Sequence, residues 1–127
     1  MREQTEVWLE YAKRDLSAAE ALYAHRRYAY VLFACQQAIE KTIKAVLVEQ
    51  TGELPRKIHD LVTLCREAGI ALSPEQAELL GELTYLYIET RYPGMDTDAA
   101  FAMDTEDAEH YWSQTKEVCA WLREMIR

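Results

Sequence analysis

What the sequence lacks already excludes several kinds of protein. Its 127 residues include only four Gly and three Pro, as expected for helices joined by short loops. It contains no glycine-rich loop to hold a phosphate, no Ser nucleophile elbow and no cluster of metal-ligand residues. No apolar run approaches the length of a membrane span, and the charged N-terminus is unlike a signal peptide. We therefore expect a cytoplasmic protein that uses neither a metal ion nor a cofactor.

Cysteines are also few, and their arrangement argues against both disulfides and zinc. The three are an odd number without paired spacing, and each falls on an apolar helical stripe: Cys35, Cys65 and Cys119. A zinc site needs ligands that are closer together in the sequence. We interpret the three thiols as small buried hydrophobic groups in a reducing compartment.

Half of the residues are apolar, and a chain of this length is large enough for one hydrophobic core. Helical periodicity and helix-end signals predict helices over residues 3–24, 28–50, 58–69, 74–91 and from 104 or 105 to the end. We expect residues 92–104 to form a loop, with Pro93 and Gly94 ending the fourth helix. The chain should therefore be a single domain, residues 1–127, with an all-α fold. The expected architecture is an up-and-down antiparallel bundle of four main helices and one short helix.

Acidic residues dominate, but unevenly. The net charge is −8, which makes the chain a poor general binder of nucleic acid. Residues 1–66 hold ten Lys or Arg and nine Asp or Glu, a balance of +1, whereas residues 67–127 hold four and thirteen, a balance of −9. An anionic ligand should therefore be drawn to the first half or to local exceptions in the second, such as Arg91.

The second predicted helix carries polar residues at the border of its apolar stripe. That stripe consists of Leu32, Cys35, Ile39, Ile43 and Val46. Gln36 and Glu40 lie at its border, and Lys44 follows one turn later, so Glu40 and Lys44 form a favourable helix pair. The row is compatible with a bundle helix that has a polar edge, and also with a helix that lines a polar cleft.

Asp15 falls in the middle of the apolar stripe of the first helix, where an unpaired carboxylate is costly. Because a short turn joins the first two helices, they should be antiparallel neighbours, with Asp15 and Lys41 within ~6 Å in height. Lys44, Arg91, His59 and a tyrosine hydroxyl are further candidate partners. A structural bond between helices and a role at a functional cleft both remain open. His59 is expected in the first turn of the third helix, together with Asp60.

The fourth predicted helix is apolar on two faces. Leu79, Leu83, Leu86, Tyr87 and Thr90 form its expected core face. Tyr85, Ile88 and Tyr92 lie on the opposite side, and we predict that they form the interface of a homodimer. Trp121 falls off the stripe of the last helix and is interpreted as another contact residue.

Four sequence features, in this order along the chain, resemble those of the HEPN family. They are Asp15-Leu16, the run from Gln36 to Lys41 with Lys44-Ala45 behind it, His59-Asp60-Leu61, and Thr90-Arg91-Tyr92-Pro93. The resemblance covers about the whole chain. It implies an all-helical bundle that is often a homodimer and is frequently encoded beside a small nucleotidyltransferase. Some members are ribonucleases.

The ribonuclease members share an Arg followed four to six residues later by His, and this chain departs from that pattern. Arg91 is followed by residues 92–98, which contain no His. We therefore assign no catalytic residue and expect a nucleotide-binding or substrate-presenting accessory subunit of a nucleotidyltransferase. The candidate nucleotide-binding residues are Asp15, Lys41, Lys44, His59 and Arg91. Two alternatives remain: a ribonuclease toxin or its degenerate relative, and a purely structural dimer.

Overall fold

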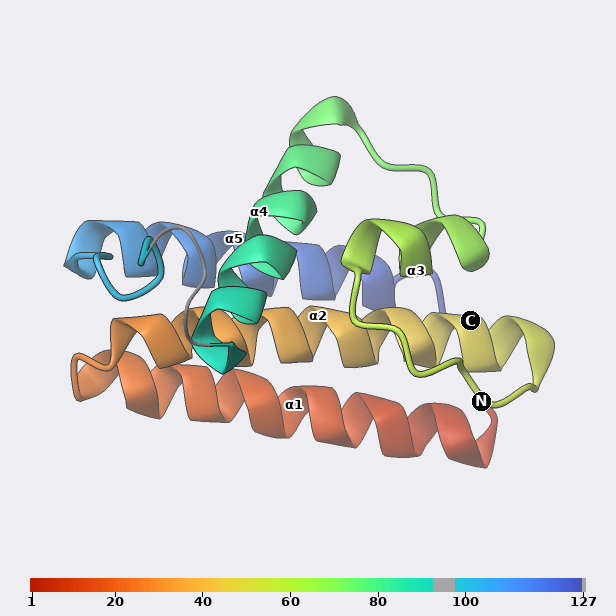
Figure 1. Cartoon of the computed structure of the whole chain (residues 1–127). Coiled ribbons are helices and arrows are strands. Elements are labelled where there is room, and N and C mark those ends of the chain that lie inside the picture. The colour runs from red at the N-terminus through yellow and green to blue at the C-terminus, as the bar shows by residue number, and fades with distance from the viewer. Residues whose placement is uncertain (93–97, 127) are drawn as a thin grey trace.

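The computed structural model describes residues 1–92 and 98–126, and its regular secondary structure within these ranges is entirely helical. The helices are α1 (Glu3–Ala24), α2 (Tyr28–Thr51), α3 (Leu61–Glu67), α4 (Pro74–Arg91) and α5 (Thr105–Arg123). Helices α1 and α2 are antiparallel, and α1, α2 and α5 lie lengthwise beside one another while α4 crosses them steeply (Figure 1). The predicted all-α bundle of four main helices and one short helix is confirmed.

Helix α2 is the centre of the bundle. It packs against each of the other four helices. Fifteen of its 24 residues are buried, so this helix has no broad solvent-facing side. Small residues such as Ala34, Ala38 and Ala45 are fully or almost fully buried along it and allow the neighbouring helices to approach closely. A helix enclosed in this way must satisfy every polar side chain that it carries from within the protein.

The ends of α4 and α5 are set by local hydrogen bonds. The Ser73 hydroxyl accepts a hydrogen bond from the backbone N–H of Gln76. In return, the side chain of Gln76 accepts a hydrogen bond from the backbone N–H of Ser73. Asp104 and Asp107 make the same reciprocal pair at the start of α5. Such capping boxes satisfy N–H groups that have no partner inside the helix. These two starts agree with the boundaries predicted from the sequence.

The start of α3 differs from the prediction. The helix begins at Leu61, not near Ile58, so His59 and Asp60 precede the helix and do not occupy its first turn. The reason is that the Asp60 carboxylate accepts hydrogen bonds from the backbone N–H groups of Val62 and Thr63, which makes Asp60 the N-cap. His59 is thereby left in an extended segment that crosses α2.

The predicted loop after α4 is only partly described. Pro93 and Gly94, which we expected to end the fourth helix, lie outside the described residues, and residues 99–102 form a turn before α5. Within the described ranges, none of the helices has both the length and the apolar character needed to cross a lipid bilayer.

Candidate functional site

A buried polar row runs along α2. Gln36, Glu40 and Lys44 are 0%, 4% and 5% exposed, whereas the sequence pattern placed them at the border of the apolar stripe. The segment before α3 contacts Gln36 and Glu40, and Lys44 lies against Glu40 and near the ring of Trp8 in α1. The Gln36 side-chain amide donates a 2.7 Å hydrogen bond to the backbone carbonyl of His59, which fixes that segment against α2.

Glu40 is the hub of this row. One carboxylate oxygen lies 2.9 Å from Lys44 Nζ, and the other accepts hydrogen bonds from Gln36 Nε2 at 3.1 Å and His59 Nδ1 at 2.8 Å. Burial raises the pKa of Glu40, but the hydrogen bonds from His59, Lys44 and Gln36 and the charge of Lys44 outweigh it, so the pKa is lowered. Glu40 is therefore ionised at neutral pH.

The ionised Glu40 determines how His59 presents its ring. A carboxylate can only accept hydrogen bonds, so the proton of a neutral His59 lies on Nδ1 and Nε2 is left as an acceptor. The His59 side chain is 49% exposed while that of Glu40 is 5% exposed. A buried carboxylate thus orients an imidazole whose other nitrogen is available for a ligand.

Arg91 reaches the same region through Tyr87. Its guanidinium donates to the Tyr87 hydroxyl and lies 5.5 Å from the centre of the Tyr87 ring. The ring of His59 also lies near Tyr87, with 5.6 Å between the two ring centres. The hydrogen bond to Tyr87 raises the pKa of Arg91, and the Glu40 charge adds to this effect. Tyr87 therefore links the histidine and the arginine.

Asp15 and Lys41 form a separate ion pair beside this cluster. Asp15 Oδ2 lies 2.7 Å from Lys41 Nζ, at ion-pair distance but outside hydrogen-bonding geometry. The two side chains are 22% and 20% exposed, so the pair lies near the surface and not in a closed core. Tyr11 flanks it, with its ring centre 5.8 Å from Lys41 Nζ. Lys41 is thus the partner that the height argument indicated for Asp15.

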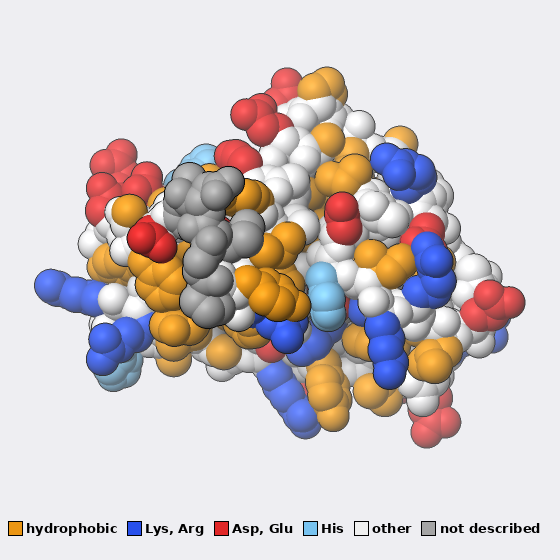
Figure 2. Space-filling view, in the orientation of Figure 1, with side chains coloured by type: hydrophobic (Ala, Val, Ile, Leu, Met, Phe, Trp, Pro, Cys, Tyr) orange, Lys and Arg blue, Asp and Glu red, His pale blue; other side chains and the backbone are white. Residues whose placement is uncertain are grey.

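The five candidate residues differ in what they can offer a ligand. Lys44 is buried against Glu40, and Asp15 and Lys41 are paired with each other. His59 and Arg91 have exposed functional groups. Figure 2 shows Lys, Arg and His side chains gathered on the middle of this face, with Asp and Glu mostly towards its edges.

Sequence reasoning missed two residues that hold this site together, Glu40 and Tyr87. Glu40 was noted at the border of the apolar stripe, as a helix pair with Lys44 and within the HEPN-like run, but not as a site residue, and Tyr87 was noted only as a core residue. The four-residue spacing of Gln36, Glu40 and Lys44 was the available signal, since three polar groups in one row need partners. No pattern in the sequence indicates that Tyr87 lies between His59 and Arg91.

The predicted dimer face is exposed in the single chain. Tyr85 is 40% and Tyr92 56% exposed, and Ile88 is half-buried. This exposure is compatible with a contact between copies, and the homodimer stays a prediction.

A family model described as HEPN domain matches residues 5–125. The crystal structure of TT1696 from Thermus thermophilus is similar with a TM-score of 0.83 and 24% sequence identity, over 98% of this chain and 99% of that chain. An archaeal HEPN homologue, ST0689, gives a TM-score of 0.77 and 22% identity over 100% of both chains. Among curated proteins, no match is found. At such identities the two solved structures show a shared fold.

Proposed function

The chain belongs to the HEPN domain family, and we propose that it is a nucleotide-binding or substrate-presenting accessory subunit of a small nucleotidyltransferase. One observation carries the ligand part of this proposal. Arg91 is an exposed cation in a strongly acidic half of the chain, and among the described residues no carboxylate forms an ion pair with it. An arginine held ready without an ionic partner suits a phosphate.

The residues around Arg91 give the proposed site its geometry. The hydroxyl and ring of Tyr87 hold the guanidinium in place, which lowers the entropy lost when a phosphate binds. His59 adds a hydrogen-bonding group next to Tyr87, and Glu40 orients its ring. Lys41 can exchange Asp15 for a phosphate oxygen, since its ion pair is partly open to solvent.

The remaining two candidates act through their neighbours. Lys44 holds Glu40 in place from inside the bundle, and Asp15 holds Lys41. The nucleotidyltransferase partner is proposed from the family resemblance of the sequence. In this arrangement the partner supplies the chemistry and this chain presents the phosphate-bearing substrate, without catalysis of its own.

Calorimetric titration with ATP, with and without any small nucleotidyltransferase whose gene adjoins that of this chain, tests the proposal. We expect weak binding that Arg91→Ala reduces about tenfold or more, because a charged hydrogen bond contributes roughly 1.5–3 kcal/mol. Lys41→Ala should weaken binding by about 1–3 kcal/mol on the same grounds. Lys116→Ala is the matched control, since Lys116 is an exposed lysine of α5 that lies over the ring of Trp112. Absence of binding both with and without the partner would contradict the proposal.

The Glu40–His59 contact favours a second candidate function, cleavage of RNA. His59 Nε2 could accept the proton of a ribose 2′-hydroxyl while Arg91 binds the phosphate that the hydroxyl attacks. The accessory function predicts that purified protein leaves single-stranded RNA intact. Cleavage that disappears in both His59→Ala and Arg91→Ala would favour the ribonuclease instead.

A further inference from the structure

A groove lies between α4 and α5. Helix α4 packs on α2 and α3, meets α5 through the hydrogen bond between Tyr111 and Glu82, and has an N-terminal half that rises away from the layer formed by α1, α2 and α5 (Figure 1). Two adjoining hollows, with volumes of about 260 and 290 Å³, lie between the two helices. Both hollows are lined by Glu75, Leu79 and Gln114, so they lie next to each other, and we refer to the two together as the groove.

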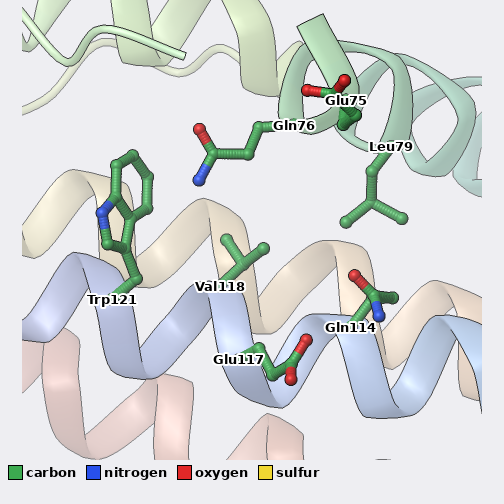
Figure 3. Close-up of a pocket in the computed structure, with 7 residues that line it drawn as sticks. All are labelled: Glu75, Gln76, Leu79, Gln114, Glu117, Val118 and Trp121. Atoms are coloured by element: carbon green, nitrogen blue, oxygen red, sulfur yellow. The ribbon is translucent and has the colours of Figure 1, made fainter. Parts of the chain in front are cut away.

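The groove has an apolar floor. Leu79 of α4 points towards Val118 of α5, and the ring of Trp121 stands in the gap beside them (Figure 3). Leu79 and Trp121 are only partly buried, although each packs against the core. Trp121, interpreted from the sequence as a contact residue, thus lines the groove.

Carboxylates line the rim of the groove. Glu75, Glu78 and Glu82 follow one another along α4, and Glu117 faces them from α5. Within the described part of the chain none of the four forms an ion pair, and His110 is the single basic side chain among the lining residues. Carboxylates spaced three and four residues apart on one helix repel each other, so their arrangement does not stabilise α4.

Tyr111 lies in the negative electrostatic field of nearby carboxylates. The Tyr111 hydroxyl donates a 3.2 Å hydrogen bond to Glu82. Burial raises the pKa of Tyr111 to about 12, and the charges of Glu82, Asp107 and Glu78 contribute to that rise. The groove therefore combines apolar area with an uncompensated negative rim.

We propose that this acidic groove, lined by Glu75, Glu78, Leu79, Glu117 and Trp121, is the docking site for a basic amphipathic helix of a partner protein. Such a helix places apolar side chains on Leu79 and Trp121 and directs Lys or Arg to the carboxylates on both sides. Charge complementarity is the argument for this occupant: the rim is negative, and it belongs to a half of the chain whose balance is −9.

The same charges exclude other occupants. Nucleic acid would be repelled by the rim. A second copy of the chain does not supply a basic helix, because none of the five helices has a net positive charge. A metal ion is also a poor fit, since the described residues include no group of three or more His, Cys, Asp or Glu that could hold one. The proposal is independent of nucleotide binding, which concerns residues at the other end of α4.

Binding of a labelled synthetic peptide of Leu, Ala and Lys, an amphipathic helix about four turns long, measures docking by fluorescence polarisation. A scrambled peptide of the same composition keeps the charge but loses the apolar stripe. The groove variant is Glu75→Lys/Glu78→Lys/Glu117→Lys. Its matched control is Glu3→Lys/Glu6→Lys/Glu20→Lys, which makes the same change in net charge on exposed positions of α1.

We expect the amphipathic peptide to bind more tightly than the scrambled one, and the groove variant to bind it at least tenfold more weakly than the control variant. Trp121→Gln should also weaken binding, with circular dichroism used to verify folding. Because the exchanged glutamates are exposed, the groove variant tests the proposal even if Trp121→Gln unfolds. Equal losses in the groove and control variants, equal binding of both peptides, or no binding at ~100 μM would overturn the proposal.

Discussion

Replacing Glu40 with Gln should lower the free energy of unfolding by about 3 kcal/mol. The change keeps the shape and one hydrogen-bond acceptor but removes the negative charge. Lys44 Nζ would then lie buried without the carboxylate that is now 2.9 Å away, with only the ring of Trp8, 5.6 Å from its nitrogen, as a favourable neighbour. The side chains of the pair are 5–6% exposed, so solvent does little to replace the lost interaction.

The magnitude follows from comparing this pair with a more exposed one. Removal of one partner from a buried ion pair costs about 3–5 kcal/mol, and we expect the lower end because the amide oxygen of Gln can still accept from His59 or Gln36. Asp15→Asn, at the partly exposed pair with Lys41, should cost about 1 kcal/mol or less. A domain of this size is stable by roughly 5–15 kcal/mol, so both variants should remain folded.

Urea denaturation followed by circular dichroism measures these changes. Adding Lys44→Met to Glu40→Gln should recover at least half of the loss, because the unpaired charge is removed together with its former partner. Stability should also depend on pH in a defined direction. The pKa of Glu40 in the folded protein is lowered from its ordinary value of 4.5. The contribution of Glu40 to stability is therefore complete above about pH 4.5 and is lost as the pH falls through the pKa of the folded state.

The difference in the free energy of unfolding between the unaltered protein and Glu40→Gln should therefore become smaller as the solution is acidified below about pH 4.5. A loss below ~1 kcal/mol at neutral pH would refute the view of Glu40 as a buried charge on which the row depends. So would a double variant that is no more stable than Glu40→Gln alone.

Three other predictions concern parts of the bundle outside this row. Burial raises the pKa of the Cys35 and Cys65 thiols to about 12 and that of the Cys119 thiol to about 11. We therefore expect the native protein at about pH 8 to react with a disulfide reagent only after unfolding. Ser73→Ala should cost about 1 kcal/mol in urea denaturation by removing the cap of α4, and an unchanged midpoint would contradict this. Ile88→Asp should convert a dimer into a monomer in light scattering; a monomeric unaltered protein at tens of micromolar, about where a modest interface holds, would refute the dimer.

Helix positions were predictable where the determinants are local. The bounds of α1 agree with the periodicity, and the starts of α4 and α5 agree because Ser73 and Asp104 cap helices through residues three positions away. The start of α3 was predicted too early, since apolar spacing alone does not show that Asp60 turns its carboxylate back onto the helix. Local signals thus determine most helix ends in this chain.

The candidate site was predictable only in part because its contacts join distant segments. The pairing of Asp15 with Lys41 follows from helix rise and a short turn, both of which can be read from the sequence. The contacts that cover Gln36 and Glu40 come from a segment some twenty residues away, and periodicity contains no information about that segment. A polar row at the border of a stripe therefore looks the same whether it faces solvent or a loop.

The buried row poses a physical question about α2. Apolar residues in place of a buried ion pair often leave a protein equally or more stable, so stability alone does not account for Glu40 and Lys44 in the most enclosed helix of the bundle. What the pair does provide is a fixed carboxylate beneath a half-exposed imidazole, at a distance of 2.8 Å. An orienting role for that carboxylate accounts for its burial next to His59, which the Asp60 cap leaves outside α3. We therefore infer that the buried row serves to position the side chain of His59 at the surface.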